Sequence, residues 1–93
     1  MSTYQLFMGR DIPGGGYVTD TDWQKFLHIV DTIVDGYTVV DADGVWLGVH
    51  EDCKVMTVST DDIESVREIA NVYKQAFDQM AVGITTLPAM EFV

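Results

Sequence analysis

Large apolar residues alternate with smaller or polar ones at the start of the chain. The alternation runs from Thr3 to Met8 and has the period of two that is typical of a β-strand. The apolar residues on one side are Tyr4, Leu6 and Met8. The next segment, Gly9 to Gly16, has no period, and its proline and three consecutive glycines predict a loop.

A different pattern follows, with apolar residues spaced three and four apart. It predicts an amphipathic helix that begins at Thr19 and runs to about Val34. Thr19 is suited to be the N-cap, and the acidic residues after it favour the positive end of a helix dipole. Gly36 is the expected C-terminal stop. The apolar stripe consists of Trp23, Phe26, Leu27, Val30, Ile33 and Val34.

Two β-branched and aromatic runs, Tyr37 to Val40 and Val45 to Val49, occupy the middle of the chain. In one interpretation Asp43-Gly44 is a hairpin turn between two short strands. In the other, one long strand bends at a bulge there, because glycine permits the required backbone angle. We favour the bent strand, because Glu51-Asp52 offers a second turn and Cys53 to Ser59 then becomes the pairing strand.

The clearest amphipathic pattern lies in the second half of the chain. It predicts a helix opened by Thr60-Asp61-Asp62, with Thr60 or Asp61 as the N-cap. Beyond this helix, Ala81 to Thr86 and Ala89 to Val93 are apolar runs separated by Leu87-Pro88, and at least one of them is expected to be an edge strand. The apolar residues of the helix are Ile63, Val66, Ala70, Tyr73, Phe77 and Met80.

The order strand, helix, strand, strand, helix, strand predicts an α+β fold of the ferredoxin-like βαββαβ type. We expect one domain over residues 1–93, with an antiparallel sheet and both helices on one face. Several strands carry large apolar groups on both faces, as with Phe7 beside Leu6 and Trp46 beside Val45. A second copy of the chain would cover the remaining face, so we expect a homodimer.

Charge narrows the range of partners. The chain of 93 residues has 15 acidic and 5 basic residues and a formal net charge of -10. Such a charge repels phosphate backbones and anionic membranes, so neither a nucleic acid nor a membrane is an expected partner. The single cysteine, Cys53, cannot form an internal disulfide, and no signal peptide pattern is present, so we expect a cytoplasmic protein. No Cys/His spacing resembles a metal site.

Motifs spread over nearly the whole chain are similar to the pattern of a known family. They begin with Phe7-Met8-Gly9-Arg10 and the glycine-rich turn, and continue with Trp23 near the start of the first helix. A second block runs from Tyr37 to Trp46, and a third is Tyr73-Lys74 followed by Phe77. Together they resemble small bacterial proteins grouped as domain of unknown function 3574. The resemblance supports the fold and implies no activity, because none is established for that family.

Arg10 is the first candidate for a binding residue, because it is one of only 5 basic residues and lies beside the glycine loop. Its guanidinium could hold a carboxylate or phosphate of a small ligand, assisted by the N–H groups of Gly14, Gly15 and Gly16. The alternatives are a salt bridge from Arg10 to Asp11 or another acid, and a plain turn for the glycines. No P-loop is present, because no Gly-Lys-Ser/Thr sequence follows.

Aromatic residues are candidates for an apolar cleft that takes a small hydrophobic molecule. The alternative is that they pack in the core or in a dimer interface. His50 lies beside two acids and would join such a site if its turn folds over a pocket. The aromatic candidates are Phe7, Tyr37, Trp46 and Tyr73.

Two further residues have weaker claims to catalysis. His28 lies three residues before Asp31 on the first predicted helix, so the two could form a His–Asp pair that acts as a base. Cys53 lies next to Lys54, whose positive charge could lower the pKa of the thiol. Neither arrangement amounts to a known catalytic motif.

The sequence leaves two functional hypotheses open. The first is a binding or interaction domain that takes a small molecule at Arg10, the glycine loop, Tyr37, Trp46 and His50. The second is an enzyme that needs no cofactor, of the isomerase or monooxygenase type, which uses His28, His50, Tyr37 or Arg10 in a cavity between sheet and helices. An enclosed cavity containing several of these polar groups would favour the enzyme, whereas a solid core would favour the binding domain.

Overall fold

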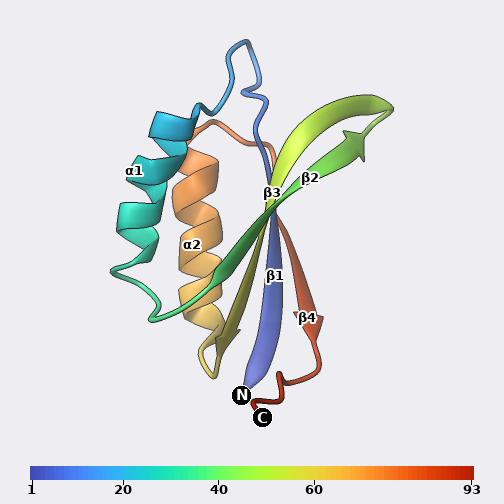
Figure 1. Cartoon of the computed structure of the whole chain (residues 1–93). Coiled ribbons are helices and arrows are strands. Elements are labelled where there is room, and N and C mark those ends of the chain that lie inside the picture. The colour runs from blue at the N-terminus through green and yellow to red at the C-terminus, as the bar shows by residue number, and fades with distance from the viewer.

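Six elements make up the computed structural model, which describes residues 1–93 (Figure 1). All neighbouring strands pair antiparallel, and their order across the sheet places the first and third strands at the centre. This arrangement confirms the predicted ferredoxin-like α+β fold. The elements are β1 (Ser2–Gly9), α1 (Asp20–Val30), β2 (Thr38–Trp46), β3 (Val49–Thr60), α2 (Ile63–Ala76) and β4 (Gly83–Leu87).

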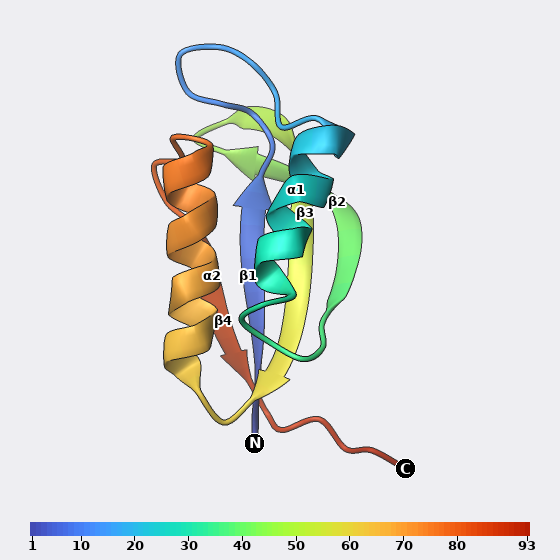
Figure 2. The same cartoon turned by 90° about the vertical axis from the view of Figure 1, so that its left-hand side faces the viewer.

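Both helices lie on one face of the sheet and run side by side across it (Figure 2). Their apolar stripes meet the residues of β1 and β3 that point to the same face, and these side chains form a closed core. Removing this apolar surface from water is the main force that holds the layers together. The core consists of Tyr4, Leu6, Met8, Val18, Trp23, Phe26, Val30, Met56, Val58, Val66, Ile69, Ala70 and Tyr73.

Helix α1 begins as predicted and ends earlier. Thr19 is the N-cap: its Oγ1 accepts from the backbone N–H of Asp22 at 3.1 Å, and its own N–H donates to the Asp22 carboxylate at 3.2 Å. The helix ends at Val30, so the prediction of an end near Val34 is wrong. The residues beyond it form a tighter turn, in which Ile33 N–H bonds to Val30 at 2.9 Å, yet Ile33 and Val34 still pack against the core.

The central hairpin confirms the long strand and corrects the position of its turn. Strand β2 runs through Asp43-Gly44, and its pairing with β3 skips no residue, so the strand contains no bulge. The turn is Leu47-Gly48, with φ of 50° and 78°, as in a type I′ hairpin. Glu51-Asp52 was predicted to be this turn and instead lies within β3.

Helix α2 and the last strand also need small corrections. Asp62, rather than Thr60 or Asp61, is the N-cap, because its carboxylate accepts from the N–H of Glu64 at 2.9 Å. The helix ends at Ala76, so Met80 lies beyond it and is 72% exposed. Of the two apolar runs at the end of the chain, the first supplies β4, which is an edge strand as expected.

Candidate functional site

The sheet face opposite the helices is almost free of charge. Directly opposed residues of antiparallel strands point to the same face, and the pair Leu6 and Met56 faces the helices. The alternate positions, such as the pair Phe7 and Val55, therefore form the other face, which we call the open face. Glu51 is its only charged residue. The open face comprises Thr3, Gln5, Phe7, Gly9, Thr38, Val40, Ala42, Gly44, Trp46, Val49, Glu51, Cys53, Val55, Thr57, Ser59, Gly83, Thr85 and Leu87.

A cavity of about 550 Å³, the open-face cavity, lies at one end of this face. There the hairpin of β2 and β3 curves out of the sheet, away from the helices (Figure 1). The hairpin tip forms one wall, and two others come from the loop after β1 and the segment between α2 and β4. Large apolar side chains on these walls are strongly exposed, among them Trp46 at 57%, Leu47 at 82% and Met80 at 72%.

Small residues leave room for the cavity. Gly9, Gly44 and Gly83 all lie on the open face and line the cavity. A Cβ at Gly9 would lie 2.7 Å from both carboxylate oxygens of Glu51, so the carboxylate rests directly on the backbone of β1. A Cβ at Gly83 would come within 3.7 Å of Phe7. Because these three residues have no side chains, they leave the space of the cavity empty, and Gly9 also leaves room for the Glu51 carboxylate at its edge.

No basic side chain neutralises the negative charge of Glu51. Its carboxylate takes part in no salt bridge, and the one hydrogen bond that it accepts comes from the backbone N–H of Asp11 at a long 3.4 Å. Asp11 is the second acid of the cavity, and no lysine, arginine or histidine lines it. The open-face cavity thus combines an apolar wall with uncompensated negative charge.

Cys53 lies on the floor of the same cavity. Burial raises the pKa of its thiol, and the charge of Glu51 adds to this effect. A thiolate is therefore disfavoured, which is the reverse of the lowered pKa expected from the neighbouring Lys54. Lys54 points to the other face, where its Nζ bonds to Asp41 and lowers the pKa of that carboxyl.

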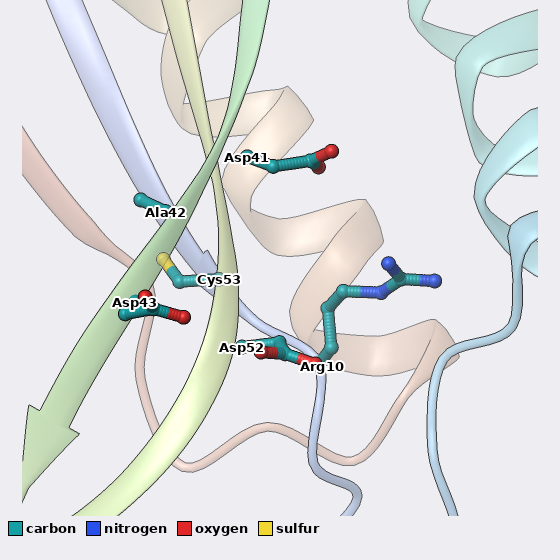
Figure 3. Close-up of a pocket in the computed structure, with 6 residues that line it drawn as sticks. All are labelled: Arg10, Asp41, Ala42, Asp43, Asp52 and Cys53. Atoms are coloured by element: carbon teal, nitrogen blue, oxygen red, sulfur yellow. The ribbon is translucent and has the colours of Figure 1, made fainter.

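Arg10 lies in a second pocket, of about 310 Å³, and its guanidinium is turned away from Asp43 and Cys53 (Figure 3). The side chain is nearly buried, and its Nε and Nη2 donate to the carbonyl of Val18 at 2.9 and 2.6 Å. Nη2 also donates to Asp20 at 3.0 Å. Arg10 thus forms a salt bridge with an acid, as in the alternative interpretation, although the partner is not Asp11.

The surroundings of Arg10 do not favour an anion. Its guanidinium stacks on the ring of Tyr17 at 4.6 Å from the centroid, and the hydroxyl of Tyr17 donates to Asp52 at 2.9 Å. Burial, followed by this hydrogen bond, raises the pKa of Tyr17. Three aspartates, Asp41, Asp43 and Asp52, line the pocket. These acids would repel an anionic ligand. The hydrogen bonds of Arg10 to Val18 and Asp20 instead fasten the base of the loop that leads into α1.

The glycine loop extends away from Arg10. Gly14, Gly15 and Gly16 have φ of 88°, 122° and 107° and are exposed at its tip. The N–H of Gly15 donates to Ile12 at 3.0 Å, and the N–H of Ile12 donates to Gly16 at 3.1 Å. The loop is thus a tight, internally bonded turn, and none of its three glycines lines the pocket that contains Arg10.

The remaining predicted residues lie apart from one another. Tyr37 precedes β2 and donates its hydroxyl to Asp31 at 2.6 Å, which raises the pKa of Tyr37 to about 12. His50 and His28 are exposed and line neither of the two pockets. Tyr73 is fully buried, and its hydroxyl donates to the carbonyl of Gly9 at 2.6 Å. Of the candidates from the sequence, Phe7, Trp46 and Cys53 line the open-face cavity, whereas Arg10, the three loop glycines, Tyr37 and the two histidines do not.

Sequence reasoning missed Glu51, because it placed this residue in a turn. The sequence does not show which residues of β3 point to which face of the sheet. Once the turn is at Leu47-Gly48, the register places Glu51 on the same face as Phe7 and Trp46. Leu47 and Met80 were also missed, because a cavity wall formed by three separate segments has no local pattern in the sequence.

The fold and the open-face cavity define a ferredoxin-like domain with a site of ligand size on the uncovered face of its sheet. The chain belongs to the family described as "Protein of unknown function (DUF3574)", whose pattern matches residues 3–92. No curated protein matches the chain. Among solved structures, a phage SAM lyase in the apo state is similar, with a TM-score of 0.70 and 16% identity over 99% of this chain and 92% of that one. At this identity the similarity shows the fold alone.

Neither helix is long and apolar enough to cross a membrane. Nor do any three His, Cys, Asp or Glu side chains come together as a group that could hold a metal ion. The cytoplasmic location stays a prediction.

Proposed function

We propose that this domain is a binding module that takes a small, mainly apolar molecule into the open-face cavity. The observation that carries this proposal is the cavity itself, with about 550 Å³ of space and strongly exposed apolar walls. Small-molecule sites usually have volumes of about 300–1,000 Å³ and mainly apolar linings with a few polar groups. Exposed side chains such as Trp46 and Leu47 would lose contact with water when a ligand binds, which favours binding.

The alternative of an enzyme receives less support. The space between sheet and helices is filled by the core, and the polar groups expected in a catalytic cavity do not meet. Arg10 lies in the second pocket, whereas Tyr37, His28 and His50 line neither of the two. Because the similar phage protein is described as a SAM lyase, SAM belongs in any panel of ligands tested on this chain.

A fluorescent neutral dye, phenylnaphthylamine, provides the test. We expect saturable binding to the wild type and binding about threefold to tenfold weaker to Trp46→Ala, because an aromatic contact contributes about 0.5–1.5 kcal/mol. Ile29→Ala is the matched control, since Ile29 is 45% exposed on α1, which lies on the opposite side of the sheet. Unsaturable binding, or equal weakening by both substitutions, would contradict the proposal.

We also propose that a second copy of the chain covers the middle of the open face. Supporting this, Phe7 and Val40 are 41% and 54% exposed on either side of Val55, in a region without charge. An uncharged surface lets two copies with a net charge of -10 each meet without bringing like charges together at the contact. Self-association would then bury an apolar area that single domains rarely leave exposed.

Light scattering tests this dimer. We expect a mass of twice 10.4 kDa for the wild type and 10.4 kDa for Val40→Lys, because a buried lysine without a partner disfavours the interface. Ile29→Lys, which adds the same charge to α1, should remain dimeric. A monomeric wild type at micromolar concentration would refute the proposal.

A further inference from the structure

We infer that the ligand of the open-face cavity is an organic cation with a flat apolar body, and that Glu51 supplies its counter-charge. This inference rests on the proposed binding function and adds the chemical class of the ligand. It depends on the position, the charge and the surroundings of Glu51.

The position of Glu51 is fixed by the register of the sheet. Glu51 pairs with Gly44 and is the only charged residue on the open face. Its carboxylate lies over Gly9, where any side chain would collide with it at 2.7 Å. The Glu51 carboxylate can therefore lie on the floor of the cavity because residue 9 is a glycine, which has no side chain to displace it.

The charges around the cavity exclude an anionic ligand. Asp11 and Glu51 both line the cavity, no basic residue does, and the whole chain has a net charge of -10. An anion would meet repulsion at long range and no donor side chain with positive charge at short range.

A neutral ligand should bind more weakly than a cation. It would cover the half-buried carboxylate of Glu51 and remove water from it without providing a charge or donor in return. The backbone N–H of Asp11, at 3.4 Å, is too distant to replace that water. A cation removes this penalty, because a charge-assisted hydrogen bond to the carboxylate is among the strongest that proteins form.

The position of Trp46 indicates the shape of the cation. Trp46 pairs with Val49, so Glu51 is its diagonal neighbour on the same face. Diagonal neighbours in an antiparallel pair lie roughly 7–8 Å apart. An aromatic ring packed on Trp46 and joined by a short linker to an ammonium group spans a comparable distance. The cavity therefore fits an arylalkylamine, or a molecule of the same charge and shape.

Three compounds of nearly equal size test the charge preference: naphthylethylamine, naphthylethanol and naphthylpropionate. Amide chemical shifts followed by NMR at physiological salt give both the affinity and the place of binding. We expect the amine to bind at least about tenfold more tightly than the alcohol, which corresponds to a difference of roughly 1.4 kcal/mol in binding free energy. The propionate should produce no saturable shifts.

Two single-charge variants complete the design. Glu51→Gln should abolish the preference for the amine: the amine should bind more weakly because it loses its counter-charge, and the alcohol should bind more tightly because it no longer covers a charged carboxylate. Asp52→Asn is the matched control: it removes the same charge from the adjacent residue, whose side chain points to the other face and bonds to Tyr17. It should preserve the preference for the amine, and dispersed amide spectra will show that both variants are folded.

The outcomes separate this inference from the proposed function. If the alcohol binds the wild type as tightly as the amine, or if the two variants behave alike, the cation is refuted and the binding site stands. If none of the three compounds shifts the residues of the open-face cavity, the binding function fails and the cation with it.

Discussion

Arg10→Ala should destabilise the protein strongly. The substitution removes both hydrogen bonds to the buried carbonyl of Val18, the salt bridge to Asp20 and the contact with the ring of Tyr17. A buried carbonyl left without its partner costs about 1–3 kcal/mol, and a cation–π contact contributes about 0.5–1 kcal/mol. The ion pair adds little, because the Asp20 side chain is 92% exposed.

Together these terms predict a loss of about 2–4 kcal/mol in the free energy of unfolding. For a domain of this size, each kcal/mol lowers the melting temperature by about 4–8 °C. Thermal unfolding followed by circular dichroism measures this change, and Asp20→Asn is the control, with an expected loss below about 1 kcal/mol. The interpretation of Arg10 as a fastening residue is refuted if its substitution lowers the melting temperature no more than that of Asp20.

Three further predictions concern the cavity and α1. Gly9→Ala should displace the Glu51 carboxylate and abolish the preference for the amine, seen by NMR, with a stability loss below about 1 kcal/mol because only the end of a flexible side chain must move. Cys53 should react with iodoacetamide more slowly than free cysteine because its pKa is raised, and more slowly still when a ligand fills the cavity; mass spectrometry measures both rates. The N–H of Thr19 lowers the pKa of Asp22, so the stability advantage of wild type over Asp22→Asn should be complete near pH 7 and be lost as the pH falls below about 4 and through the lowered pKa, as measured by urea unfolding.

Local chemistry made the helix start and the strands predictable. Thr19 and Asp22 form a capping box from four consecutive residues, so the sequence contains the whole interaction. The end of α1 was less predictable, since Ile33 and Val34 pack against the core from a turn as well as they would from a helix. An apolar stripe records which residues face the core and not which backbone presents them.

The open-face cavity depends on the position of the turn between β2 and β3, which the sequence does not favour. Asp43-Gly44 and Glu51-Asp52 both have the composition of turns, yet the hairpin turns at Leu47-Gly48, where leucine adopts a φ of 50°. The register that pairs β2 with β3 and buries Met56 with Leu6 outweighs this local strain. Since the position of the turn determines which face Glu51 occupies, the cavity could be recognised only once the register was known.

The most direct test of the central claim is a crystal structure of the chain with naphthylethylamine bound. The ring should pack against Trp46 and Phe7, and the ammonium should lie within hydrogen-bonding distance of the Glu51 carboxylate, at about 2.7–2.9 Å. A ligand bound beside Arg10, or one in the open-face cavity with its ammonium turned away from Glu51, would contradict it.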